Sequence, residues 1–216
     1  MVEAHCKAQG KAQGEADKRG GTCVPCSALL AAVSRAFAYP AEGLAPTLEP
    51  LRELDAGQRG VHAQRIAQVL AAGGRFSSRT DEQLAYTRLF IGSFKMEAPP
   101  YASYYLDDDH LMNGQPAVEV AAVYRQFGIE LDSSQIAPPD HLRYLLAFCA
   151  LLARRFEETG DEAFAESYAD FRDEFILSWI GECRSLVNRY AESSYYPELI
   201  ALIVEVLTAD DPNANS

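Results

Sequence analysis

The sequence predicts an all-α fold, formed by a single bundle of helices. Apolar residues recur at every third or fourth position through most of the chain, which is the spacing of one face of a helix. We find no stretch of strand length in which apolar and polar residues alternate. Hydrophobic residues make up 48% of the 216 positions, so the chain can bury a sizeable core.

The first half of the chain predicts three helical stretches in order. Ser27 can cap a helix that runs to Pro40, because proline cannot continue a helix. Residues 47–72 predict one or two short helices, interrupted by glycines. Thr80 to Gln83 form a capping box at the start of the next helix. That helix stacks three aromatic residues at four-residue intervals: Tyr86, Phe90 and Phe94.

The second half predicts further helices. A short one spans Pro116 to Phe127, with Gly128 placed to cap its C-terminus. Pro138-Pro139-Asp140 opens a long amphipathic helix that ends at Gly160. The remaining apolar stripes run over Phe164–Phe175, Trp179–Tyr190 and Leu199–Leu207.

Two connectors lack the helical periodicity. Prolines and glycines interrupt the segment from Lys95 to Pro116, and several tyrosines lie between them. Residues 129–138 form the second connector. Long irregular segments are uncommon in compact domains and often carry function. We therefore expect both connectors to be functional loops.

The charge balance excludes some classes of partner. The chain has 19 Lys and Arg against 31 Asp and Glu, a net charge of −12. Duplex nucleic acid and anionic membranes favour a basic face, so neither is expected as the main partner. The common nucleotide, hydrolase and zinc-protease motifs are absent from the sequence. These observations favour a binding protein over an enzyme, with no cofactor.

The composition divides the chain into three parts. Residues 1–24 are polar and glycine-rich, which predicts a flexible tail. Residues 25–209 form the helical domain, and residues 210–216 are expected to fray. No apolar run follows the early basic residues, and no window approaches ~18 apolar residues, so we predict neither a signal peptide nor an integral membrane segment. The expected location is the cytoplasm.

Five cysteines, an odd number, argue against a disulfide framework. Cys23-Val-Pro-Cys26 has the spacing of a redox motif, yet no strand precedes it and no second ligand pair follows it. The incidental interpretation is favoured, and a redox- or metal-linked protein built on Cys23 and Cys26 is the alternative. Cys149 and Cys183 lie on apolar helix faces and are predicted core residues.

Two polar clusters allow more than one interpretation. Asp107, Asp108, Asp109 and His110 are consecutive, so their side chains point in different directions, which favours a solvated acidic turn over a metal site. Asp140 can be the cap of the long helix with an exposed His141 beside it. The other interpretation is that this pair faces the first connector and belongs to a site.

Taken together, the connectors resemble a known family. Leu89-Phe90 is followed by Glu97-Ala-Pro-Pro-Tyr101-Ala-Ser103-Tyr-Tyr105, and Pro139-Asp140-His141 follows further along the chain. This pair of segments resembles the TorD/DmsD/NarJ-like chaperones for molybdoenzymes, a family of redox enzyme maturation proteins. The resemblance covers roughly residues 26–207.

The resemblance implies a cytoplasmic, all-helical, TorD-like domain that is not an enzyme. Such proteins bind the twin-arginine signal peptide of a molybdopterin-dependent reductase of the DMSO reductase type, in anaerobic respiration. They assist cofactor insertion into the apo form and delay its export until maturation. The implied partners are the twin-arginine leader and the apo-reductase, and we expect a monomer, with a dimer left open.

The residue types agree with that implication. A twin-arginine leader presents two guanidinium groups and then an apolar stretch, so its receptor needs carboxylates and an apolar or aromatic groove. Glu97 and Asp140 can supply such carboxylates, and Asp107 to Asp109 can supply more. His141 either tunes the site through its charge or serves as a local hydrogen-bonding group at the helix start. The candidate peptide-binding residues are Glu97, Pro100, Tyr101, Ser103, Tyr105, Pro139, Asp140 and His141.

Overall fold

The computed structural model describes residues 24–57, 61–92, 95–129 and 137–209. The predicted tail at 1–24 and the fraying end at 210–216 lie almost wholly outside these residues, as do Cys23 and Phe94. Of the described residues, 72% are helical and none is in a strand, which confirms the prediction of a single all-α domain. The elements are α1 (Ser27–Ala36), α2 (Leu44–Gly57), α3 (Ala63–Gly73), α4 (Arg79–Tyr86), η1 (Thr87–Ile91), α5 (Ala102–Leu106), α6 (Gln115–Gln126), α7 (Leu142–Thr159), α8 (Glu162–Arg172), η2 (Asp173–Leu177), α9 (Ser178–Tyr190) and α10 (Tyr195–Thr208).

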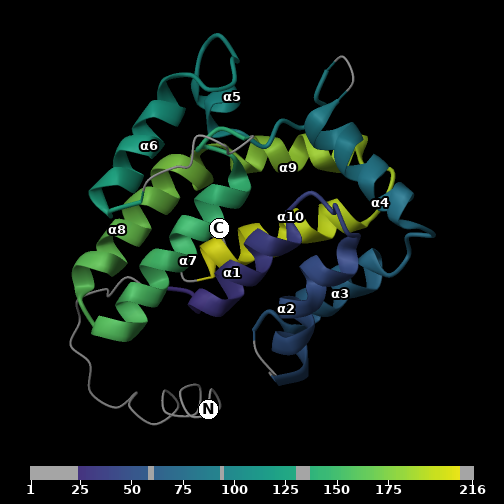
Figure 1. Ribbon diagram of the computed structural model, residues 1–216, viewed down its shortest axis with the longest axis horizontal. Coiled ribbons are helices and arrows are strands. Elements are labelled where there is room, and N and C mark those ends of the chain that lie inside the picture. The colour runs from purple at the N-terminus through teal and green to yellow at the C-terminus, as the bar shows by residue number, and fades with distance from the viewer. Residues whose placement is uncertain (1–23, 58–60, 93–94, 130–136, 210–216) are drawn as a thin grey trace.

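Helix α1 lies at the centre of the bundle. It packs against α7, α2 and α10, while α3 packs on α10 and α8 packs on α7 (Figure 1). The Glu157 carboxylate of α7 accepts hydrogen bonds from the backbone N and Oγ of Ser27, at 2.8 and 2.6 Å. The Tyr195 hydroxyl of α10 donates to the carbonyl of Ala36 at 2.8 Å. Residues distant in the sequence thus satisfy both ends of α1.

Aromatic side chains fill the part of the core nearest the connectors. The Phe37 ring lies 4.9 Å from the Phe90 ring, which lies 5.1 Å from the Tyr196 ring. Tyr86 is 5.0 Å from Phe90, so the predicted four-residue stacking of these two side chains is confirmed. The apolar face of the α4–η1 stretch is therefore fixed against α1 and α10.

The predicted helix ends at Gly128 and Gly160 hold, whereas others shift. Gly128 and Gly160 both adopt positive φ, +74° and +67°, as expected after α6 and α7. Helix α1 ends at Ala36, four residues before Pro40. The capping box predicted at Thr80–Gln83 is wrong by two residues, because Ser78 is the cap and its Oγ accepts from the backbone N of Asp81.

The first connector is more regular than the sequence suggested. Residues 102–106 form the short helix α5, which packs on α6 and α9. The π-helical segments η1 and η2 were also not predicted, since each continues an α-helix without a change in composition. In the described part of the chain, no helix combines the length and apolarity that crossing a membrane requires.

Candidate functional site

Backbone hydrogen bonds join the first connector to residues 140–142 at the start of α7, while most of the second connector, residues 130–136, lies outside the described residues. The Leu142 N–H donates to the carbonyl of Pro100 at 2.8 Å, and the Ala102 N–H donates to that of Asp140 at 3.1 Å. Tyr101 and His141 form an antiparallel bridge between these bonds. We call residues 97–105 with 137–142 the connector junction. The structure thus brings together the two segments that the sequence singled out.

Asp140 fastens the junction from within. Its side chain is fully buried, and Oδ2 accepts from the backbone N of Ser103 at 2.8 Å. Among the described residues, Oδ1 is buried without a hydrogen-bond partner. The interpretation of Asp140 as the cap of α7 is wrong, because its carboxylate faces the other connector. His141 is the cap instead, with Nδ1 accepting from the Arg143 N–H at 3.1 Å.

His141 is an uncharged structural residue at neutral pH. Only 6% of it is exposed, and burial, with a smaller contribution from the Arg143 charge, lowers its pKa from 6.5 to about 4. Since Nδ1 accepts, Nε2 carries the hydrogen and donates to the Tyr86 hydroxyl at 3.4 Å. Tuning of the site through the charge of His141 is therefore wrong near neutral pH, and its role at the helix start is confirmed.

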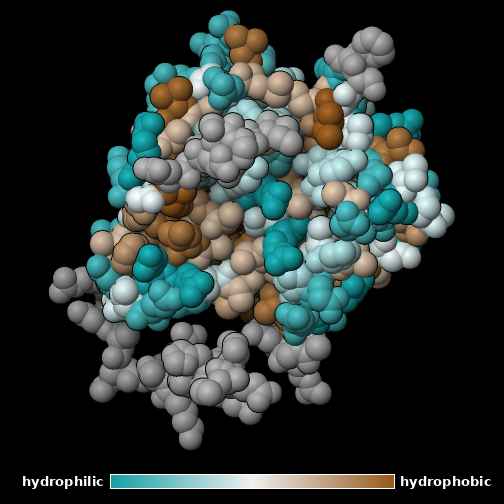
Figure 2. Space-filling model, viewed as in Figure 1, coloured by the Kyte–Doolittle hydropathy of each residue, from teal (hydrophilic) through white to brown (hydrophobic). Residues whose placement is uncertain are grey.

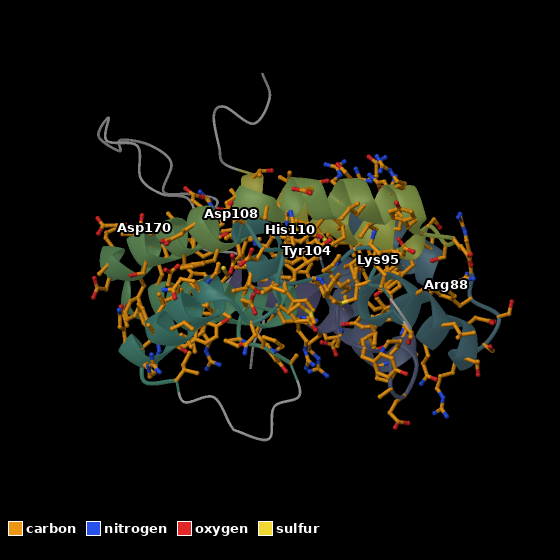
Figure 3. The ribbon with its side chains drawn as sticks, turned by 90° about the horizontal axis from the view of Figure 1, so that it is seen from above. Arg88, Lys95, Tyr104, Asp108, His110 and Asp170 are labelled. Atoms are coloured by element: carbon orange, nitrogen blue, oxygen red, sulfur yellow. The ribbon has the colours of Figure 1, made fainter. Side chains whose placement is uncertain are left out.

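Ser103 connects the junction to the loop between α5 and α6. Its buried Oγ accepts from the Asn113 N–H at 3.0 Å. Nδ1 of His110 lies 2.8 Å from the carbonyl oxygen of Tyr104. Figure 3 shows these two side chains together, with Asp108 nearby. Asp108 and Asp109 are exposed, and the described residues contain no cluster of three potential metal ligands. The geometry fits the solvated acidic turn.

The predicted site residues differ in exposure. Half of them are half-buried: Glu97, Tyr101, Tyr105 and Pro139. Tyr105 stacks on Trp179 with ring centroids 5.0 Å apart. The other half are buried: Pro100, Ser103, Asp140 and His141. The second group holds the connectors together, and only the first has surface to offer to a ligand.

A groove begins at Glu97 and follows α4 and η1 on one side and the α9–α10 turn on the other. Three cavities of about 590, 390 and 310 Å³ compose it, and neighbouring cavities share lining residues. We call it the α4 groove. The shared lining consists of Phe76, Leu84, Arg88, Leu89, Tyr190, Glu192 and Ser193. Because Glu97 lines the largest cavity, the groove and the connector junction are continuous.

The α4 groove combines apolar surface with charge. Leu84 is 57% exposed and Tyr190 is 41% exposed, although both are large apolar residues. Arg88 and Glu192 form an ion pair between the two sides of the groove. Figure 3 shows Arg88 near one end of the molecule, with Lys95 between it and the pair of Tyr104 and His110. The surface view of Figure 2 shows brown, apolar side chains among the polar ones near this end as well.

Sequence reasoning missed the far wall of this groove. Tyr190, Glu192 and Ser193 lie at the break between α9 and α10. The Glu-Ser-Ser stretch that follows the stripe ending at Tyr190 was a usable signal for a turn. Their approach to Arg88, about a hundred positions earlier, depends on the packing of the bundle.

The cysteines divide into two kinds. Cys149 and Cys183 are buried, and burial raises the pKa of both thiols, to about 12 for Cys183, which confirms them as core residues. Cys26 is exposed and directly precedes α1. Since Cys23 lies outside the described residues, nothing tests the favoured incidental interpretation of this pair or its redox- or metal-linked alternative.

Comparisons with known proteins agree on one group. The family described as nitrate reductase delta subunit matches residues 53–185. The chain is 33% identical over 172 residues to the chaperone protein TorD of Vibrio vulnificus strain YJ016, covering 76% of this chain and 77% of that protein. It is 27% identical over 153 residues to TorD of Vibrio parahaemolyticus, covering 67% and 71%.

A solved structure supports the fold. A redox enzyme maturation protein from Archaeoglobus fulgidus superposes with a TM-score of 0.53 and covers 89% of this chain and 98% of its own. The two share 22% sequence identity, so this likeness concerns the arrangement of helices alone.

Proposed function

The chain belongs to the nitrate reductase delta subunit family, in which the TorD chaperones also stand, and from this premise we propose that it is a maturation chaperone for a molybdoenzyme. In this role it binds the twin-arginine signal peptide of a molybdopterin-dependent reductase. It holds the apo-reductase during cofactor insertion and delays export until then. It acts in the cytoplasm, by binding and not by catalysis.

One observation carries the proposal: the connector junction opens into a groove that has both chemistries a twin-arginine leader requires. Carboxylates of Glu97, Asp81 and Glu192 line the groove for the guanidinium groups. Exposed Leu84 and Tyr190 offer apolar and aromatic contact for the stretch that follows. A cationic, partly apolar peptide also suits a chain with a net charge of −12.

The predicted site residues take two roles in this proposal. Glu97, Tyr101, Tyr105 and Pro139 are half-buried and contact the leader or the client. Pro100, Ser103, Asp140 and His141 are buried and hold the connectors in position. Asp140 is therefore a positioning residue, and the expectation that its carboxylate meets a leader arginine is withdrawn because the side chain has no exposed surface.

Calorimetry with synthetic leaders tests the function. We expect a twin-arginine leader from a molybdoenzyme of the same organism to bind with a dissociation constant of about 1 μM or tighter. A Lys-Lys version should bind about tenfold more weakly, because lysine cannot form the bidentate pair that arginine forms with a carboxylate. Absence of binding to every such leader would rule the proposed function out.

A further inference from the structure

We propose that Glu192, in the turn between α9 and α10, receives one arginine of the leader, and that Arg88 occupies this carboxylate until the leader arrives. The inference rests on the proposed function and adds to it a position for the arginine and a competing group within the chain. Arg88 and Glu192 both line the two larger cavities of the α4 groove.

The ion pair itself indicates what this position accepts. Arg88 projects from η1, and Glu192 follows the last residue of α9 by two positions, so the pair bridges the two walls. A guanidinium group thus already lies against this carboxylate inside the groove. An arginine from a bound peptide can take the same place with the same geometry.

The pair is exposed enough to exchange partners. The two side chains are 63% and 71% exposed, and such surface pairs contribute only about 0–1 kcal/mol. Arg65 gives the contrast, because it pairs with both Glu198 at 2.7 Å and Glu205 at 3.3 Å and is only 32% exposed. Among the described residues, Arg88 has Glu192 as its one carboxylate partner.

The surroundings favour an arginine that belongs to a peptide. The aromatic ring of Tyr190 lines the groove next to Glu192, and guanidinium groups stack on such rings. Ser193 also lines the groove beside Glu192.

Charge-neutral variants of the pair test the inference by calorimetry with a synthetic Arg-Arg leader. Glu192→Gln should weaken binding about threefold to tenfold, as loss of a charged hydrogen bond at a partly exposed site. Arg88→Gln should strengthen binding about twofold to fourfold, because it frees Glu192 and removes a like charge. In a Glu192→Gln background, Arg88→Gln should lose most of that gain.

A second exposed pair provides matched controls. Arg154 and Glu158 on α7 form an ion pair that is 72% and 45% exposed and lies outside the groove lining. Arg154→Gln and Glu158→Gln change the net charge by the same amounts, and each should alter leader affinity less than twofold. Circular dichroism of all variants should show unchanged helical content.

If the unaltered chain binds the leader, the proposed function stands, and two outcomes with the variants would still overturn the inference. One is a Glu192→Gln affinity equal to that of Glu158→Gln. The other is weaker binding by Arg88→Gln, which would mean that the intact pair is what the leader recognises. If the unaltered chain binds no leader, the proposed function and the inference both fail.

Discussion

The connector junction and the α4 groove lie next to each other and are built in opposite ways. In the junction, Asp140 and His141 are almost completely buried, and each hydrogen-bonds to backbone. In the groove, Arg88 and Glu192 are about two-thirds exposed and bond only to each other among the described residues. The junction fixes positions, whereas the groove offers groups that can change partners.

This difference separates two kinds of sequence signal. Half of the predicted site residues in the segments that carry the family resemblance form the buried joint: Pro100, Ser103, Asp140 and His141. The groove residues Leu84, Tyr190 and Glu192 stand on helix surfaces and at a turn, where many side chains are accommodated. In this protein, the recognisable motif therefore identifies residues that hold the proposed site in position more than residues that contact a ligand.

The largest expected effect is a loss of stability at low pH, caused by His141 in the connector junction. The pKa of His141 is about 4 in the folded protein and 6.5 when unfolded, so the unfolded state binds the proton more readily. The free energy of unfolding should therefore fall as the pH drops from about 6.5 to about 4, by about 3 kcal/mol. Urea unfolding at a series of pH values measures it.

His141→Asn is the matched variant, since asparagine still offers a cap acceptor to the Arg143 N–H but does not titrate. Its stability should decline less over the same pH range. If the free energy of unfolding changed with pH equally in the two proteins, burial would not be keeping the imidazole neutral. The contrast between the buried junction and the exposed groove would then be weaker.

The next effect concerns the buried carboxylate. Asp140→Ala leaves the Ser103 N–H without its acceptor, and an unpaired buried donor costs about 1–3 kcal/mol. Because the variant also removes a carboxylate oxygen that has no partner in the described structure, we expect a net loss near the lower end, about 1–2 kcal/mol.

Asp140→Asn keeps an oxygen for Ser103 and should be the more stable of the two substitutions in urea unfolding. Leader affinity should follow the same order, because Asp140 acts through the position of the connectors. Equal stability of the alanine and asparagine variants would remove Asp140 from its role as the fastening residue.

The smallest expected effect is in the groove. Leu84→Gln should weaken leader binding about threefold, through lost apolar contact, and should change the stability of the fold by less than about 0.5 kcal/mol. Val118→Gln on α6 is the control, since Val118 is 56% exposed against 57% for Leu84 and lies outside the groove lining. An equal effect of both substitutions on leader affinity would argue against the groove as the binding surface.

The sequence predicted those parts of the fold that depend on local chemistry. Gly128 and Gly160 end helices at positive φ, a conformation that glycine adopts without steric cost, so their positions could be read directly. The start of α4 was missed by two residues because Ser78 and Thr80 are both good caps, and the choice between them is made by the whole helix.

The site was less predictable, since Asp140 had two available partners. As a residue before a helix it can cap α7, or its carboxylate can bond to the backbone of Ser103, 37 positions earlier. Local chemistry favours the cap, and the tertiary packing that brings Pro100 to Leu142 selects the second. The pairing of Arg88 with Glu192 depends on the same packing and left no local trace.

The distant bonds at the two ends of α1 affect how the protein is made. The hydrogen-bond partner of Ser27 is Glu157, which is synthesised 130 positions later. The partner of Ala36 is Tyr195, which is synthesised 159 positions later. At a synthesis rate of about 5–20 residues per second, this interval is on the order of ten seconds. During that time, the apolar face of α1 has neither α7 nor α10 to cover it.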